Sequence, residues 1–299
     1  MDLGAIARER WMRRECGRLF HGVGEGRPGL TIDRYGEVCL VQTWGDAFTQ
    51  EDFAEQDFPG RPVFVPRGSD RPWSGPELEH IFEELGLRYR FQTPAPGEDP
   101  VIFLDLRCAR RWLKSNARGR VLNAFSYTCG TGLAAAANGA EVVNLDHGRL
   151  CLEKGRDHAR LNDLKMSFLR EDFYCAVRQF AGLSVRHRKG MRRYRSQAFD
   201  LVVLDPPTFS KGPFGAVDIL RDYAGLAKPC LMALKPGGRL LATHHHASVP
   251  YLGWVEEVKR CADKAGRPIA QVERLPVEAD FPSFDDNPPL KVAVFTLGV

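Results

Sequence analysis

The feature that most restricts the fold is a series of short apolar segments in the second half of the chain. Three of them read as strands with helix-forming sequence between them: Val121–Phe125, Glu141–Leu145 and Leu201–Leu204. A fully apolar strand such as the last is typical of a parallel sheet whose two faces are both covered. Alternating strands and helices therefore predict an α/β fold with a Rossmann-like, doubly wound sheet and right-handed crossovers.

Other segments of this half continue the alternation. Helices are predicted at Leu133–Asn138, Arg149–Asn162 and Phe173–Ala181, and strands at Met166–Leu169, Arg239–Thr243 and Val292–Leu297, with a turn at Lys235–Gly238. Ligands of such sheets bind beyond the carboxyl ends of the strands. The residues that directly follow each strand are therefore the first candidates for a functional site.

The clearest seam in the chain is Thr93–Pro100, which contains three prolines and one glycine. Such a segment cannot sustain a helix or a central strand, so we place a domain boundary here. Residues 1–96 are predicted to form a small α+β domain that could bind substrate, and residues 97–299 the α/β domain. The small domain should contain a hairpin of Leu30–Asp33 and Val38–Gln42 that turns at Arg34–Gly36, and a helix at Pro76–Leu85.

Composition limits the classes of protein that fit. None of the eight cysteines forms a C-x-x-C pair, and no apolar run is long enough for a membrane span, so we expect a soluble cytoplasmic protein with reduced thiols. The net charge of +4 is weak evidence for nucleic acid. A basic run at residues 186–195 could contact phosphates, or it could be a solvated or disordered loop. It precedes the Leu201 strand, at the sheet end away from the predicted site.

A glycine-containing loop follows the first predicted strand. Gly130 and Gly132 allow a tight turn, and the helix that begins there offers unpaired N–H groups to an anion. Asp146 ends the next strand, where it could accept ribose hydroxyls. Ser126–Cys129 lengthen the loop, and Asp146 comes earlier than in the dinucleotide pattern. The spacing therefore favours S-adenosylmethionine over a dinucleotide.

Two more loops carry candidate residues. Asp172 follows the predicted Met166–Leu169 strand and could accept an adenine amino group, or cap the next helix, or both. Asp205 follows the most apolar strand, and Pro206 and Pro207 then remove two N–H donors, which leaves carbonyls for a base amino group. Phe209 could stack on that base. This loop is the predicted catalytic site.

Taken together, these motifs resemble those of bacterial large-subunit ribosomal RNA methyltransferases. The segments that match are VLNAFSYTCGTG, the strand-end Asp146, EDF and VVLDPPTFS, and FLDLR at 103–107 resembles a cofactor segment, FLDQR. RLFHGVGEGRPGLTIDRYGEVCLVQ resembles the small central domain of the branch that makes 5-methylcytosine. DPPTFS is shared with the branch that methylates guanine N7.

The resemblance implies a class I methyltransferase that uses S-adenosylmethionine as its cofactor. The implied partner is RNA, with ribosomal RNA favoured. The implied cofactor-binding residues are Phe103, Arg107, Asn123, Phe125, Ser126, Thr128, Gly130, Gly132, Asp146, His147, Asp172 and Phe173. The implied catalytic residues are Asp205, Pro206, Pro207 and Phe209, with His244 at the acceptor strand. No metal is predicted, because consecutive strand residues such as His244–His246 alternate between faces.

Three departures from the family pattern affect the prediction. The chain is expected to lack the PUA RNA-binding domain, and Leu106 replaces the glutamine of FLDQR. His244 takes the place of the cysteine that attacks a pyrimidine, and imidazole is a poor substitute for a thiolate. We therefore predict methylation of a nitrogen, with guanine as the first candidate.

The alternatives are methylation of a small molecule or protein, and a non-catalytic RNA-binding factor. A homodimer is possible.

Overall fold

A computed structural model describes residues 1–45, 48–67, 77–95, 98–186, 191–283, 285 and 287–299. The chain divides into two compact units. Unit 1 contains Met1–Arg107 and Glu278–Phe284, and unit 2 contains Cys108–Val277 and Asp285–Val299. The Thr93–Pro100 seam thus lies inside unit 1, and the assignment of separate functions to residues 1–96 and 97–299 stays a prediction.

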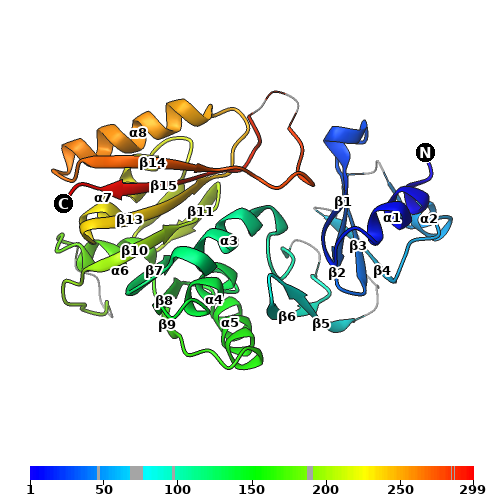
Figure 1. Cartoon of the computed structure of the whole chain (residues 1–299), viewed down its shortest axis with the longest axis horizontal. Helices are drawn as coiled ribbons and strands as arrows, with labels where there is room; N and C mark the ends of the chain where they lie inside the picture. The colour runs from blue at the N-terminus through cyan, green and yellow to red at the C-terminus, as the bar shows by residue number, and fades with distance from the viewer. Residues whose placement is uncertain (46–47, 68–76, 96–97, 187–190, 284, 286) are drawn as a thin grey trace. The chain divides into compact units, whose positions relative to one another are not determined.

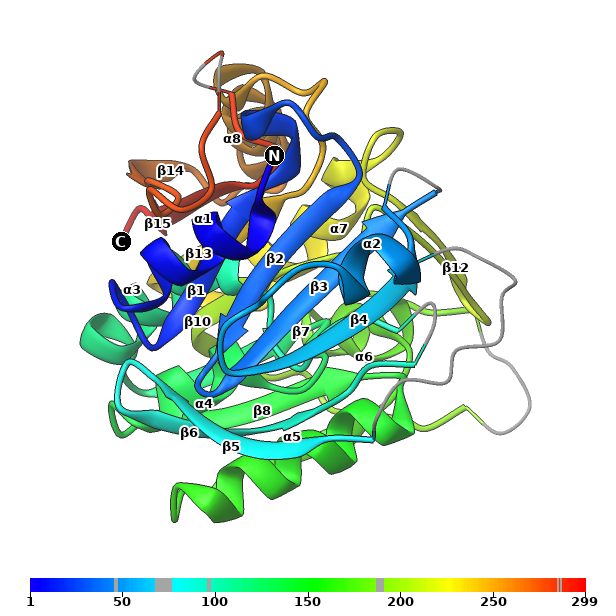
Figure 2. The ribbon, with the colours of Figure 1, turned by 90° about the vertical axis from the view of Figure 1, so that its right-hand side faces the viewer.

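Unit 1 contains a four-stranded sheet in the order β1-β2-β3-β4. Its strands are β1 (Cys16–His21), β2 (Leu30–Tyr35), β3 (Val38–Trp44) and β4 (Arg61–Arg67), of which β3 and β4 are parallel. Helices α1 (Leu3–Trp11) and α2 (Gln50–Ala54) lie on one face, where they cover an apolar cluster (Figure 2). The predicted hairpin is confirmed as β2–β3, and it turns at Gly36, whose φ is +63°.

The predicted helix at Pro76–Leu85 is wrong. Pro76 lies outside the described residues, and Glu79–Glu84 forms a strand, β5, that pairs with β6 (Leu87–Gln92). Leu85 and Gly86 connect them with φ values of +55° and +72°, as a two-residue hairpin turn requires. The helix-favouring glutamates misled the prediction, because burial of alternate side chains against a partner strand outweighs propensity.

Unit 2 is built on a seven-stranded sheet in the order β14-β15-β13-β10-β7-β8-β9 (Figure 1). The strands are β7 (Arg120–Ala124), β8 (Glu141–Asp146), β9 (Ser167–Arg170), β10 (Phe199–Leu204), β13 (Leu234–His244), β14 (Ile269–Leu275) and β15 (Lys291–Leu297). The strands from β13 to β9 are parallel to their neighbours, whereas β15 is antiparallel to both β13 and β14. The predicted α/β fold is confirmed.

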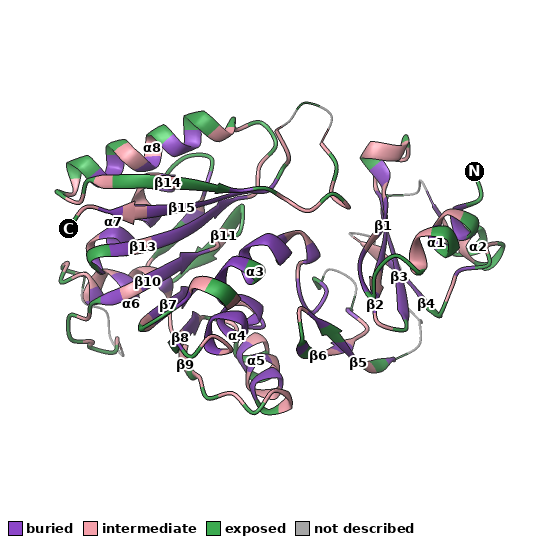
Figure 3. Ribbon diagram, in the orientation of Figure 1, coloured by how far each residue is buried: buried purple, intermediate pink, exposed green. Residues whose placement is uncertain are grey.

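Helices cover both faces of this sheet. They are α3 (Arg107–Asn116), α4 (Gly130–Ala136), α5 (Arg149–Leu161), α6 (Phe173–Phe180), α7 (Tyr223–Met232) and α8 (Tyr251–Lys264). Leu122 and Ala124 of β7 belong to a core that includes residues of α6, α7 and α8. Asn123 lies between them and therefore faces the opposite side, where it contacts α4. The central strands are accordingly buried along their length (Figure 3).

The segment Lys235–Gly238 is not a turn that precedes its strand. It lies within β13, where the register with β10 jumps from the pair Phe199–Leu234 to the pair Leu201–Arg239. Gly237 in this bulge has φ +68°, a conformation that favours glycine. The strand therefore begins five residues earlier than Arg239, the predicted start.

The order of the strands locates the crevice of unit 2. From β7 the chain proceeds to β8 and β9 on one side, and it then returns to β10 on the other side of β7. Ligands of open α/β sheets bind at this reversal, outside the carboxyl ends of the strands. Within the described ranges, no helix has the length and apolar character needed to cross a bilayer.

Candidate active site

The loop after β7 has an unusual backbone. Phe125, Tyr127 and Cys129 have φ values of +57°, +47° and +66°. Non-glycine residues rarely adopt this region, and they remain there only when the surrounding structure holds them. Here, the Ser126 N–H donates to the Leu145 carbonyl at 3.0 Å, and the Cys129 N–H donates to the Ser126 carbonyl at 2.7 Å. The loop is therefore attached to the end of β8 and leads directly into α4.

A buried polar network supports this loop from below. The Asn123 Nδ2 donates to Asn144 Oδ1 at 2.9 Å, and the Thr131 hydroxyl donates to Asn123 Oδ1 at 2.9 Å. Gly132 lies against the same groups, because a Cβ there would come 2.0 Å from Asn144 Oδ1. Asn123 is completely buried and thus holds β7, β8 and α4 together. Gly132 is required for the close approach of α4, which sequence spacing alone did not reveal.

Asp146 ends β8 next to this loop. Its Oδ2 accepts the Tyr127 N–H at 2.8 Å, and its Oδ1 accepts the Gly148 N–H at 2.8 Å. Each carboxylate oxygen has a second lone pair, so the group can still accept hydrogen bonds from a ligand hydroxyl. The neighbouring His147 side chain is 73% exposed, with Nδ1 3.8 Å from Asp146 Oδ1. The acid therefore fixes the loop and also faces the crevice.

Asp172 and Phe173 begin α6. Asp172 Oδ1 accepts the Cys175 N–H at 3.1 Å, so the predicted helix-capping role is confirmed. The Phe173 ring stacks on Phe125 with centroids 4.6 Å apart. The preceding Glu171 accepts the Tyr194 hydroxyl at 2.9 Å. Burial and this hydrogen bond raise the pKa of Tyr194 to about 12, so the phenol remains a donor.

A cavity in unit 2 collects several of these residues. It is lined by Phe125, Asp146, His147, Asp172 and Phe173, together with Ser210, Lys211, Gly212, Gly215 and Val217. The last five belong to a hairpin of β11 (Phe209–Gly212) and β12 (Gly215–Asp218), which the sequence analysis missed. A Cβ at Gly212 would come 2.3 Å from Asp172 Oδ2, so the glycine lets the hairpin approach that acid closely. The turn residues Gly212 and Pro213 could have indicated it.

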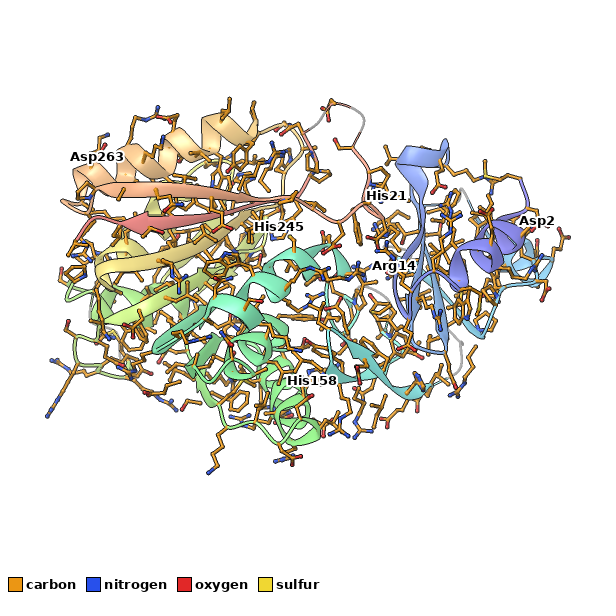
Figure 4. All side chains as sticks on the ribbon, viewed as in Figure 1. Asp2, Arg14, His21, His158, His245 and Asp263 are labelled. Carbon is orange, nitrogen blue, oxygen red and sulfur yellow. The ribbon has the colours of Figure 1, made fainter. Side chains whose placement is uncertain are left out.

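These residues fit an adenosine group. The cavity offers carboxylates for hydroxyl and amino donors, and the Phe125–Phe173 pair is an apolar wall for a ring. Ser126 and Thr128 are buried in the loop, and the Thr128 carbonyl is 3.1 Å from His158 Nδ1 on α5, where Figure 4 shows His158. Gly130 and Gly132 open α4. The predicted cofactor residues after β7, β8 and β9 therefore meet at one end of the sheet.

Phe103 and Arg107 belong to unit 1. The Arg107 guanidinium is buried, lies 3.1 Å from Glu84 and 3.3 Å from Asp280, and donates to the Cys16 carbonyl at 3.1 Å. These two carboxylates raise the pKa of Arg107 against the opposing effect of burial. Leu106 is buried beside it in the short turn Leu104–Leu106. The cofactor role of Phe103 and Arg107 stays a prediction.

The Asp205 loop follows β10, as the sequence predicts. Asp205 Oδ1 accepts the Thr243 hydroxyl at 2.5 Å and lies 2.7 Å from His245 Nε2. Pro206 is buried, Pro207 is exposed, and the Phe209 side chain is 55% exposed at the start of β11. The loop thus combines a side-chain cluster on one side with an exposed aromatic ring on the other.

The structure separates the roles of the neighbouring histidines. His244 is 1% exposed and packs against Tyr223 and Trp254, with ring centroids 5.5 and 6.1 Å away. Burial lowers the pKa of His244 to about 4. It therefore lies in the core rather than in an acceptor pocket. His245, which the sequence analysis did not select, contacts Asp205 instead, because consecutive strand residues face opposite sides.

The thiols of Cys108 and Cys129 do not replace the missing nucleophile. Cys108 and Cys129, the two that the sequence places near candidate residues, are both buried. Burial raises the pKa of the Cys129 thiol to about 12 and that of Cys175 to about 11. A thiol with such a pKa is protonated at neutral pH and reacts slowly. Among the described residues, no group of three or more His, Cys, Asp or Glu could hold a metal.

The basic run at residues 186–195 lies only partly within the described structure. Arg188 and Lys189 fall outside it. Gln179 of α6 holds the end of the run, since its side chain bonds the Arg192 carbonyl and the Tyr194 N–H. The run leads into β10 at Phe199, the amino end of that strand, whereas Asp205 follows the carboxyl end.

A family model described as S-adenosylmethionine-dependent methyltransferase matches residues 66–296. Ribosomal RNA large subunit methyltransferase I of Vibrio vulnificus is 29% identical over 288 residues, which is 89% of this chain and 70% of the relative.

Two solved structures share the fold. A candidate SAM-dependent methyltransferase from Streptococcus mutans superposes with a TM-score of 0.77 at 22% identity, covering 98% of this chain and 80% of that one. The SAM-dependent methyltransferase from Agrobacterium tumefaciens superposes with a TM-score of 0.65 at 19% identity, covering 91% and 87%.

Proposed function

The chain belongs to the family of S-adenosylmethionine-dependent methyltransferases, whose model matches residues 66–296, and from this premise we propose that it methylates a base of RNA. Ribosomal RNA is the favoured substrate. The observation that carries the proposal is the loop after β10, in which Asp205 and the prolines are followed by the exposed ring of Phe209. The ribosomal RNA methyltransferase named above supports the same substrate class.

The cofactor would be held by residues at the carboxyl ends of β7, β8 and β9. We propose that Asp146 accepts the ribose hydroxyls, that Asp172 accepts the adenine amino group, and that Phe125 and Phe173 contact the ring. When bound, the cofactor supplies a methyl group that its sulfonium already activates. The chain's own residues therefore need chiefly to position the acceptor and to exclude water from it.

The loop after β10 would hold the acceptor base. Pro206 and Pro207 have no N–H, so their loop presents acceptors rather than donors to an amino group. Phe209 would stack on the base, as aromatic side chains do on unstacked RNA bases. Such a site selects an extruded base in a loop or at a helix end rather than a base within a duplex.

The acceptor atom would be a nitrogen rather than a pyrimidine carbon. Methylation at C5 of a pyrimidine requires a nucleophile that adds to C6. His244 occupies the position expected for that nucleophile but is buried in the core, and the Cys129 thiol has a raised pKa. Guanine is the first candidate for the base.

The test is transfer of labelled methyl groups by the purified protein to ribosomal RNA, and in parallel to protein and metabolite pools. Mass spectrometry of the nucleosides in ribosomal RNA from cells that lack the protein should show one methylated nucleoside missing. Label only in a metabolite or protein would overturn the RNA assignment. A stable adduct with RNA that contains 5-fluorocytosine would overturn the nitrogen assignment.

The molar mass of the protein in solution would test whether it forms a homodimer.

A further inference from the structure

The pair formed by Asp205 and His245 has the geometry of an oriented base. Asp205 follows β10 and His245 follows β13, and these strands are parallel neighbours, so both residues lie at the carboxyl ends of the sheet. Asp205 Oδ1 is 2.7 Å from His245 Nε2. Figure 4 shows His245 beyond the end of β13. The His245 side chain is 26% exposed and that of Asp205 15%, so the pair is partly open to a ligand.

The hydrogen bond fixes which ring nitrogen carries the proton. A carboxylate oxygen accepts hydrogen bonds and has none to donate, so His245 Nε2 must be the donor. In the neutral ring the lone pair is then on Nδ1. The Thr243 hydroxyl also donates to Asp205 Oδ1, which leaves this oxygen shared between two donors.

The surrounding core holds the pair in place. Thr243 is completely buried, and its carbonyl accepts the Tyr223 hydroxyl at 2.7 Å. On the other side of His245, the His246 carbonyl accepts the Lys291 ammonium at 2.7 Å. Thr243, two residues before His245, is thus bound to α7, and His246, directly after it, is bound to β15. A general base has to be positioned in this way to work efficiently.

We propose that His245 is the catalytic base of this enzyme and that the acceptor is a nitrogen that carries hydrogen, such as the exocyclic amino group of a base. This rests on the proposed function, in which the substrate is an RNA base. The acceptor nitrogen forms a bond to the methyl carbon, and the carbon–sulfur bond breaks with its electron pair going to sulfur. The nitrogen then loses its proton to His245 Nδ1, while Asp205 stabilises the imidazolium.

The first test needs no acceptor molecule. Nitrogen NMR of the protein with labelled histidine should show His245 as a single tautomer protonated at Nε2, with the signal assigned by its loss in His245→Gln. Asp205→Asn should convert it to a mixture of tautomers. A ring protonated at Nδ1 in the wild-type protein, or no response to Asp205→Asn, would overturn the proposal.

The second test compares neighbouring histidines during turnover. His245→Ala should reduce methyl transfer to RNA by roughly a hundredfold or more, and added imidazole should restore part of it, with cofactor affinity unchanged. His246→Ala is the matched control and should retain activity, because within the described part of the chain its half-buried ring bonds only Ser248.

The outcomes separate this proposal from the one on which it rests. Wild-type protein that leaves RNA unlabelled contradicts the RNA function, while the NMR result still decides whether the pair is formed. Labelled RNA with full activity in His245→Ala contradicts the base. A product methylated on a nitrogen without hydrogen, such as guanine N7, also contradicts it, because that transfer releases no proton from the acceptor.

Discussion

The loop after β7 and the segments after β10 and β13 meet at the same end of one sheet, but they are stabilised by different groups. The first has a left-handed backbone at Phe125, Tyr127 and Cys129, and its own N–H groups hold it by donating to backbone carbonyls and to the Asp146 carboxylate. The second is held by side chains, with Asp205 bonded to Thr243 and His245. Backbone N–H donors do not titrate, whereas the geometry of a carboxylate–imidazole pair depends on the protonation of the ring.

This difference matches the two tasks of a methyltransferase. The cofactor is always the same molecule, so its side of the crevice can be rigid and strained. On the proposal above, the acceptor side would position a particular base and accept its proton, through Asp205 and His245. Substitutions in the two regions should therefore fail in different ways, through cofactor affinity on one side and through turnover on the other.

The largest effect is expected for Asp205→Ala. Methyl transfer should fall by about a hundredfold or more, near 3 kcal/mol in activation free energy, because the base loses its orienting partner. Cofactor affinity, measured by calorimetry, should stay within about threefold, since the residue lies outside the cofactor loop. Asp200→Ala, on the same strand at its amino end, serves as the control and should turn over normally. Retained turnover in the Asp205 variant would contradict the division between a cofactor region and a catalytic region.

A smaller effect is expected for Asp146→Ala. Cofactor affinity should fall by roughly ten- to a hundredfold, or about 1.5–3 kcal/mol, because ribose hydroxyls lose a charged acceptor. The loop also loses the bonds from the Tyr127 and Gly148 N–H groups, so thermal stability is measured alongside. Glu141→Ala, at the exposed start of the same strand, is the control. If folded Asp146→Ala protein bound the cofactor as tightly as wild type, the ribose would have to bind elsewhere.

The buried His244 should contribute a pH-dependent term to stability. Burial lowers its pKa to about 4, while the unfolded chain titrates near 6.5. Between these values the unfolded state binds more protons, so this stability is complete above pH 6.5 and is lost as the pH falls to about 4.

The contribution of His244 to the free energy of unfolding should be about 1–3 kcal/mol. Between about pH 4 and 6.5, the free energy of unfolding in urea should therefore change with pH by about that much less in His244→Phe than in wild type. An equal slope in wild type and His244→Phe would show that this ring titrates as in the unfolded chain.

The smallest effect on stability is expected for Phe209→Ala. The side chain is mostly exposed, so the free energy of unfolding should change by less than about 0.5 kcal/mol. RNA binding should nevertheless weaken by about 1–3 kcal/mol if the ring stacks on a base. Binding assays against RNA, with Leu220→Ala as a similarly exposed apolar control, would check this. Unchanged RNA affinity would remove Phe209 from the acceptor site.

Sequence patterns with a strong local cause predicted much of unit 2. The apolar strand Leu201–Leu204 can be stable only in a covered sheet, and strand-end acids such as Asp146 and Asp205 must then lie at one end of that sheet. The order of the elements from β7 to β10 follows from the same alternation, whereas the β11–β12 hairpin, α7, α8 and β14 were not predicted. Unit 1 was harder, because Glu79–Glu84 combines helix-favouring residues with a strand that only its partner β6 stabilises.

What the sequence determined by itself is the class of fold, the order of β7, β8, β9, β10, β13 and β15 along the chain, and the acids that follow β8, β9 and β10. These were predictable because hydrophobic periodicity and turn residues act locally. What only the tertiary structure decided is which side chain of a short run faces the crevice. His244 and His245 have the same side chain, but successive residues of a strand face opposite sides. Packing against Tyr223 and Trp254 therefore buries His244 alone. The register of β13 beside β10 then brings His245 to Asp205, and no pattern within the chain fixes that register.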